Sequence, residues 1–184
     1  MTAPGVRAVL RDTDVKRLHR EWRHRTGGRL ALLLDSVQTP YNVGAIVRTA
    51  AAERVEHLYL AGAATAPSHP AARKVSLGTE RYLEWSTYET PAAAIAAVKE
   101  AGLRLVGVEL AAGAVPLPDA DLGPAVCLAF GHEDRGLSAA TLAACDEVAF
   151  IPQLGKVGSL NVAHAAAIAI YETRRRAWTG VIDT

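Results

Sequence analysis

Apolar residues in this chain form short continuous runs that alternate with stretches of helical periodicity. The runs predict buried strands at residues 30–34, 57–61, 82–86, 103–110, 126–130 and 148–151. Helices are expected between and after them, at residues 43–53, 90–101, 137–144 and 160–178. Strands that are apolar throughout and alternate with helices are typical of a mostly parallel sheet flanked by helices. The pattern therefore predicts an α/β fold.

Two segments depart from this alternation. Residues 12–25 predict a short amphipathic helix, started by Asp12 or Thr13 as its cap. Residues 62–81 include Pro67, Pro70 and Gly78 and are expected to form an irregular loop. No repeat or linker divides the remainder. The chain is therefore expected to comprise a basic N-terminal helical extension, residues 1–29, and one α/β domain, residues 30–184.

Charge is unevenly distributed although the net charge is only +1. Residues 1–29 carry eight Lys or Arg against three acids, residues 30–173 carry nine against fifteen, and residues 174–184 carry three against one. Two basic ends on an acidic body suit a polyanion such as RNA, although terminal charges are often only solvated. The candidate RNA contacts lie in the first helix and near the C-terminus: Arg17, Arg20, Arg23, Arg174, Arg175 and Arg176.

Several classes of protein are disfavoured. No stretch approaches the roughly 20 apolar residues that a membrane span needs, and the N-terminus has no apolar segment of signal-peptide length. Cys127 and Cys145 are expected to pack as small hydrophobic residues, and a reducing cytoplasm is the expected location. No metal site is predicted. The first strand leads into residues 35–40 without a glycine-rich turn, which disfavours an ordinary nucleotide-dependent α/β enzyme.

The first block of candidate chemistry, residues 42–50, places Arg48 in an otherwise apolar helix. Its guanidinium must reach solvent or find an anion, because burying it alone is very costly. A salt bridge with Glu53 and a contact with a phosphate or ribose are both compatible with the sequence. Asn42 suits the N-cap position of this helix.

Two further blocks each join an apolar strand to a helix through a glycine-bearing loop. The second block, residues 128–138, contains Glu133 within a charged turn that suits either acid–base chemistry or an exposed loop. The third block, residues 151–164, contains Ser159 as a possible helix cap. Asn161 follows in the first helical turn, where its amide has no structural necessity. Ligands of open α/β sheets bind beyond the carboxyl ends of the strands, where both loops are expected.

In order and spacing the three blocks resemble the motifs of the SpoU/TrmH branch of the SPOUT methyltransferases. Those motifs read approximately N-x-G-x-[IL]-x-R-T-A, G-x-E-x-x-G-[IL] and I-P-M-x-G-x-x-x-S-L-N-V-S. The match extends over about residues 30–175. His132, Gln153 and Ala163 stand where the family commonly has Asn, Met and Ser. These departures are expected to affect loop packing and cofactor affinity.

The resemblance implies a SPOUT fold with a C-terminal trefoil knot, a homodimer, and S-adenosylmethionine as the methyl donor. The adenosine part would be held largely by backbone groups near four residues: Leu128, Gly131, Ile151 and Leu160. The catalytic positions of the family correspond to five residues of this chain: Asn42, Arg48, Glu133, Ser159 and Asn161.

The function that the resemblance implies is S-adenosylmethionine-dependent methylation of a ribose 2′-hydroxyl in RNA. Folded tRNA is favoured over rRNA, because no separate RNA-binding domain precedes the core as in some rRNA-modifying members. The alternative is a non-catalytic RNA-binding or assembly protein that keeps the fold. Calorimetry with S-adenosylmethionine would separate the two, because a protein that only binds RNA need not bind the methyl donor.

Overall fold

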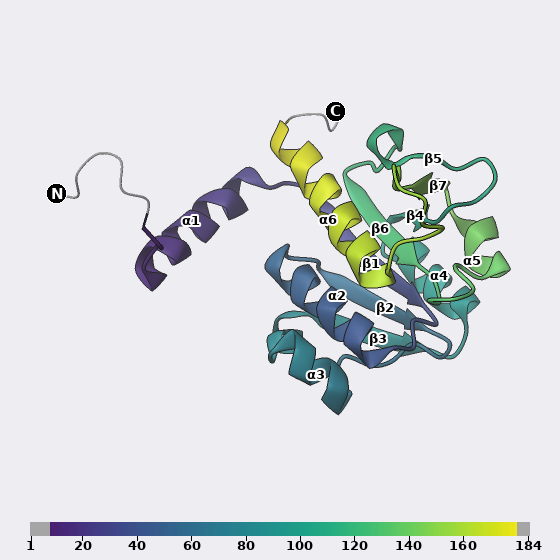
Figure 1. Ribbon diagram of the computed structural model, residues 1–184, viewed down its shortest axis with the longest axis horizontal. Coiled ribbons are helices and arrows are strands. Elements are labelled where there is room, and N and C mark those ends of the chain that lie inside the picture. Colours follow the sequence, from purple (N-terminus) through teal and green to yellow (C-terminus); the bar gives the residue numbers. More distant parts are fainter. Residues whose placement is uncertain (1–7, 180–184) are drawn as a thin grey trace.

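Within residues 8–179, which the structure describes, seven strands form one sheet in which every pairing is parallel. In this computed structural model the strand order is β3-β2-β1-β6-β4-β7-β5 (Figure 1). The strands are β1 (Arg29–Asp35), β2 (His57–Ala61), β3 (Glu84–Tyr88), β4 (Arg104–Val108), β5 (Val115–Pro116), β6 (Ala125–Phe130) and β7 (Glu147–Phe150). The predicted parallel α/β sheet is confirmed, with the short β5 as an additional edge strand.

Helices cover both faces of the sheet. α2, α3 and α6 pack on one face, and α4 and α5 pack on the other (Figure 1). The helices are α1 (Asp12–Arg25), α2 (Pro40–Ala52), α3 (Pro70–Ser76), α4 (Pro91–Glu100), α5 (Ala139–Ala144) and α6 (Val162–Thr179). Two short 3₁₀ helices, η1 (Thr79–Tyr82) and η2 (Leu117–Asp119), complete the described elements.

The central strand β1 contributes to both halves of the core. Leu30, Leu32 and Leu34 pack with the helices of one face, whereas Ala31 and Leu33 pack with those of the other. Alternate side chains of a strand point to opposite faces, so an uninterrupted apolar run is what a strand covered on both sides needs. Burial of each leucine contributes about 1.5–3 kcal/mol.

Residues 62–81 do not form the loop that the sequence predicts, because they contain α3 and η1. Pro70 is the first residue of α3, where a missing amide proton costs no helical hydrogen bond. His69 caps this end, its Nδ1 accepting from the amide of Ala71 at 3.2 Å. Gly78 follows the helix with a left-handed φ of 78°. The apparent helix breakers therefore mark the ends of a helix and not its absence.

The helix α1 has the predicted bounds and stands away from the sheet (Figure 1). None of its residues is buried, and Arg11 occupies the N-cap position, one residue before the predicted caps. Its C-terminal end is anchored on α6. The rings of Trp22 and Trp178 meet edge to face with centroids 5.0 Å apart, and Trp178 Nε1 donates to Thr26 Oγ1 at 2.7 Å.

The basic end of α6 corrects part of the RNA-contact prediction. Arg174 is only 5% exposed and donates to the backbone oxygens of Glu53 and Arg54, at 2.9 and 2.8 Å. Arg176 is 8% exposed and donates to two backbone oxygens around η2. Both guanidiniums satisfy carbonyl groups inside the protein, so the prediction was wrong for these two residues. Arg175 keeps a partly exposed side chain, which pairs with a glutamate one turn earlier on α6.

The close approach of α2 and α3 requires glycine at position 44. A Cβ at Gly44 would lie 2.8 Å from Val75 Cβ and closer still to the backbone oxygen of Ala72. We expect Gly44→Ala to lower the free energy of unfolding by about 1–3 kcal/mol, as overpacking of a core does. Urea denaturation measures this. Gly27→Ala is the matched control because nothing lies within 4 Å of its Cβ position, and equal losses in both variants would contradict the packing argument.

Candidate active site

The three blocks meet at the carboxyl-terminal edge of the sheet. β1 ends at Asp35 and leads into α2, and β6 ends at Phe130 and leads through residues 131–138 into α5. β7 ends at Phe150 and leads through residues 151–161 into α6. β1 and β6 are paired neighbours that run in the same direction, so the loops that follow them leave the sheet side by side. Open α/β sheets bind ligands at this edge.

A chain of hydrogen bonds connects one residue from each block. Asn161 Nδ2 donates to Asn42 Oδ1 at 2.9 Å, and Asn42 Nδ2 donates to Glu133 Oε1 at 3.0 Å. Asn161 Oδ1 in turn accepts from the amide of Ala163 at 2.9 Å. In this series of hydrogen bonds each group donates to the next one toward the Glu133 carboxylate. The side-chain amides of Asn42 and Asn161 therefore each have one defined orientation. Side chains up to 119 positions apart thereby form one hydrogen-bonded unit.

The two asparagines differ from their predicted local roles. Asn42 lies within the first turn of α2, and Thr39 occupies the N-cap position with no side-chain hydrogen bond. Asn161 immediately precedes α6 and caps it through Ala163, a role that the sequence assigned to Ser159. Ser159 is instead exposed in the preceding loop. The residue without an evident structural need is therefore Ser159.

Glu133 also holds the entry to α2. Its carboxylate accepts from the backbone amides of Gln38 and Thr39, at 3.2 and 2.9 Å. Burial by itself would raise the pKa of Glu133, but the hydrogen bonds from Asn42 and the backbone outweigh it and lower the pKa to about 2. The group is therefore ionised at neutral pH, beside the amino end of a helix, where a negative charge is favoured.

Two carboxylates that the sequence analysis did not single out hold the loop of the second block. Asp35, only 2% exposed, accepts from the amide of Ser138 at 3.0 Å and from Thr141 Oγ1 at 2.6 Å. Glu109 accepts from the amide of Leu137 at 3.0 Å. Asp35 is the last residue of β1, and Glu109 directly follows β4. An acid at the carboxyl end of an apolar strand is the sequence signal that could have identified both.

The four predicted cofactor residues are placed differently. Leu128 is fully buried in β6, with β1 on one side and β4 on the other, so neither its side chain nor its backbone faces the sheet edge. This corrects the prediction for Leu128. Gly131 lies at the start of the loop, and a Cβ there would collide with the backbone returning at Gly136. Ile151 and Leu160 are partly exposed, at the two ends of the loop after β7.

Arg48 reaches solvent from α2. Among residues 8–179 it takes part in no salt bridge, so the predicted alternative of an ion pair with Glu53 is not formed. The structure thus joins Asn42, Glu133 and Asn161 into one unit and leaves Arg48 and Ser159 as exposed groups on the same helix and loop. Within the described part of the chain neither the guanidinium nor the hydroxyl has an internal partner, so both are available to a ligand.

Other kinds of chemistry find little support in the described part of the chain. It contains no group of three or more His, Cys, Asp or Glu side chains that could hold a metal ion. Burial raises the pKa of both thiols, that of Cys145 to about 11, so neither Cys127 nor Cys145 is a ready nucleophile. Across residues 8–179, none of the helices combines the length and apolarity that crossing a membrane requires.

Comparison with known families decides the classification. The model of the SpoU rRNA methylase family matches residues 29–171. The chain belongs to this family. Its three blocks and the hydrogen-bonded unit that joins them all lie within the matched region.

Relatives of this SpoU family chain act on more than one kind of RNA. The 23S rRNA (guanosine-2′-O-)-methyltransferase RlmB of Acinetobacter baylyi is 35% identical over 148 residues, which cover 80% of this chain and 60% of RlmB. AviRb of Streptomyces viridochromogenes, a SpoU methyltransferase solved with AdoMet, has a TM-score of 0.77 and 31% identity, covering 84% of this chain and 62% of AviRb. A third similar structure was solved to give insight into the 2-OH methylation of C/U34 on tRNA. It has a TM-score of 0.73 and 32% identity, and the match covers 83% of this chain and 98% of that one.

This chain spans 60% of the length of RlmB and 63% of that of the tRNA (guanosine(18)-2′-O)-methyltransferase of Escherichia coli. The shared part is the α/β domain with the three blocks. α1 precedes the residues that the family model matches.

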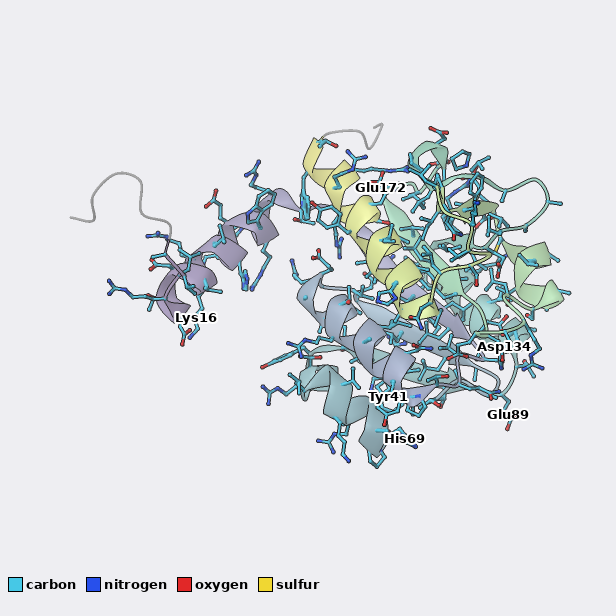
Figure 2. All side chains as sticks on the ribbon, viewed as in Figure 1. Lys16, Tyr41, His69, Glu89, Asp134 and Glu172 are labelled. Atoms are coloured by element: carbon cyan, nitrogen blue, oxygen red, sulfur yellow. The ribbon has the colours of Figure 1, made fainter. Side chains whose placement is uncertain are left out.

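The low pKa of Glu133 makes a prediction about acid stability. A pKa lowered from 4.5 to about 2 means that the ionised group stabilises the fold above pH 4.5, and that this contribution is lost as the pH falls through 4.5 toward 2. We expect Glu133→Gln to lower the free energy of unfolding by about 1–3 kcal/mol at neutral pH, with the difference from the wild type closing in acid. Denaturation over a pH series measures this. Asp134→Asn, an exposed carboxylate of the same loop (Figure 2), is the control, and a pH-independent difference for Glu133→Gln would contradict the argument.

Proposed function

We propose that this protein transfers a methyl group from S-adenosylmethionine to a ribose 2′-hydroxyl in RNA. The observation that carries the proposal is the hydrogen-bonded unit of Asn42, Glu133 and Asn161 at the carboxyl edge of the sheet. Arg48 and Ser159 stand exposed on the same helix and loop. The rRNA and tRNA methyltransferases among the relatives support this reaction class.

The chain supplies positioning and electrostatic stabilisation. A ribose hydroxyl is a weak nucleophile, and aligning two bound reactants can contribute about 7–11 kcal/mol toward the barrier. Arg48 is a poor general base, because a guanidinium holds its proton too tightly. Its role is to bind the phosphate next to the target ribose and to stabilise negative charge developing on the 2′ oxygen. Ser159 and Asn161 orient the ribose, and the ionised Glu133 keeps the loops in place.

The loops after β6 and β7 fit S-adenosylmethionine, which when bound supplies an electrophilic methyl group. Gln153 Oε1 is a buried acceptor with no partner among the described residues, and an amino group of a ligand would satisfy it. Gly155 leaves open space at its α-carbon. We assign cofactor binding to the backbone around Gly131 and to Ile151 and Leu160, the partly exposed ends of the third-block loop.

As substrate we propose tRNA over rRNA. The support is the likeness to the chain solved for 2-OH methylation on tRNA, which is 32% identical with a TM-score of 0.73. On α1, Arg17, Arg20 and Arg23 are exposed and would hold phosphates beside the core, and Arg175 would add a contact from α6.

We also propose a homodimer. Ile168 and Tyr171 are exposed apolar residues one turn apart on α6, and Leu154 is fully exposed in the loop before it. A second copy would cover them. The family further supports a trefoil knot in the C-terminal segment, and the two free cysteines fit a cytoplasmic location.

The decisive experiment is a methyl-transfer assay with tritiated S-adenosylmethionine on bulk tRNA and on rRNA, followed by mapping of the modified nucleoside. We expect 2′-O-methylated nucleoside in tRNA. Calorimetric binding of S-adenosylmethionine without methyl transfer to either RNA would contradict the enzymatic proposal. Failure to bind S-adenosylmethionine at all would favour the non-catalytic RNA-binding alternative.

The role of the planar guanidinium predicts a catalytic defect in Arg48→Lys. We expect kcat at saturating RNA to fall at least about tenfold, because lysine keeps the charge but loses the fork of donors. Affinity for S-adenosylmethionine should stay unchanged. Arg54→Lys, an exposed arginine beyond the end of α2, is the control and should keep full activity. Full kcat in Arg48→Lys would show that the guanidinium has no special role.

The proposed RNA contacts of α1 predict a salt effect. Replacing both Arg17 and Arg20 by Ala removes two exposed cations and leaves the Trp22 anchor in place. The slope of log affinity against log salt concentration should fall by about 0.7–0.9 for each lost phosphate contact. Filter binding of bulk tRNA at several salt concentrations measures this. An unchanged slope would exclude α1 as an RNA arm.

A further inference from the structure

Basic residues in the acidic body of the protein are concentrated on one pair of packed helices. α2, α3 and η1 together carry four Lys or Arg and a single acid, whereas the other positions of residues 30–173 carry five against fourteen. These elements lie together on one face of the sheet (Figure 1), with α3 held against α2 at Gly44. The folded domain therefore presents a local positive surface that its net charge conceals.

The single acid on these elements is occupied internally. Glu80 accepts from Ser76 Oγ at 2.8 Å and from Arg73 Nε at 2.9 Å. These hydrogen bonds keep the pKa of Glu80 below its usual value, and the bond from Ser76 has the largest effect. The pairing fixes η1 on the end of α3. It also holds the Arg73 side chain, which remains 62% exposed.

The remaining groups of this surface face solvent. Lys74 is exposed on α3, and Tyr82 is 66% exposed at the end of η1. The Arg81 guanidinium lies over the Tyr82 ring, 4.7 Å from its centroid, and donates to the Tyr82 hydroxyl at 2.8 Å. We call Arg73, Lys74, Arg81 and Tyr82 the α3 patch. Cations interleaved with an exposed aromatic ring are the elements that single-stranded nucleic acid binds.

A hollow beside this patch offers room for a ligand. It has a volume of about 350 Å³ and is lined by Ser68, Pro70, Arg73, Lys74 and Gly78. A hydroxyl, a guanidinium and an ammonium group are together suited to a phosphate group. A second hollow of about the same volume, lined by Lys99, Leu103 and Asp146 among others, lies between α4 and the start of β4. Its two cations are Lys99 and Arg104, but Arg104 is paired with Asp121 and Glu147. The Asp146 carboxylate lines the same hollow, which therefore suits a phosphate less well.

The α3 patch is continuous with the candidate active site through α2. Tyr41 and His69 lie at neighbouring ends of α2 and α3 (Figure 2). Tyr41, which is 65% exposed, directly precedes Asn42 of the hydrogen-bonded unit. Arg48 lies seven positions after Tyr41, a rise of about 10 Å along one face of the helix. The outward face of α2 thus leads from the reaction edge alongside α3.

We propose that the α3 patch binds the RNA strand next to the target nucleotide. A backbone phosphate occupies the hollow against Arg73 and Lys74. Arg81 pairs with a neighbouring phosphate, and a base stacks on the Tyr82 ring. This assignment rests on the proposed function, because it takes the RNA substrate as the occupant. It places the strand along α2 and α3, on the domain itself, in addition to the contacts proposed for α1.

Filter binding of bulk tRNA by the full chain, at several salt concentrations, tests the patch. We expect Lys74→Ala and Arg81→Ala each to weaken binding about fourfold at roughly 0.15 M salt and to lower the salt slope by about 0.7–0.9. Lys99→Ala is the matched control, since it removes an exposed helical lysine beside the second hollow on the opposite face of the sheet. The control should retain wild-type affinity and slope, and all three variants should retain wild-type thermal stability and affinity for S-adenosylmethionine.

Stacking has a separate signature. We expect Tyr82→Ala to weaken binding about fivefold or more with little change in the salt slope, and Tyr82→Phe to restore it. If the wild type binds and methylates RNA but Lys74→Ala and Arg81→Ala keep its salt slope, the patch proposal is overturned and the proposed function stands. A change in oligomeric mass without a change in RNA binding would also overturn it, by making the patch a protein interface. A wild type that neither binds nor methylates RNA would overturn the proposed function itself.

Discussion

The ionised carboxylate of Glu133 is the acceptor on which the candidate site is built. It takes hydrogen bonds from Asn42 and from two backbone amides at the entry to α2, and Asn42 in turn orients Asn161. These donors outweigh the effect of burial and lower the pKa of the carboxylate, so it is charged at neutral pH. Removing the charge would take away the strong acceptor toward which the Asn42 amide donates. The positions of three distant segments therefore depend on one charged group.

The sheet makes that convergence possible. Parallel strands place their carboxyl ends at one edge, and the central pairing of β1 with β6 brings the first and second blocks together there. Two glycines, which have no side chain, let neighbouring backbone segments come close together. Gly44 lets α3 approach α2, and Gly131 lets the second-block loop fold back on itself. Glu109 and Asp35 then hold the end of that loop by accepting from the adjacent amides of Leu137 and Ser138.

The basic residues that cluster near the C-terminus of the sequence are not the ones that form a basic surface in the folded domain. Arg174 and Arg176 look like a basic tail, yet their guanidiniums satisfy backbone oxygens in the interior. The basic surface that the domain does present comes from Lys74 and Arg81, in a segment expected to be a loop. An arginine placed among apolar residues must find acceptors, and buried carbonyl groups serve as well as a phosphate.

The amino-acid sequence by itself determined the α/β class, the order of most strands and helices along the chain, and the three blocks, because apolar periodicity and motif spacing are local properties. It also determined the bounds of α1. Only the tertiary structure decided which groups face each other. It made Asn161 a helix cap, placed Leu128 in the core, and left Arg48 without the Glu53 ion pair. The physical reason is that burial and hydrogen-bond partners arise from residues far apart in the chain, which no local pattern records.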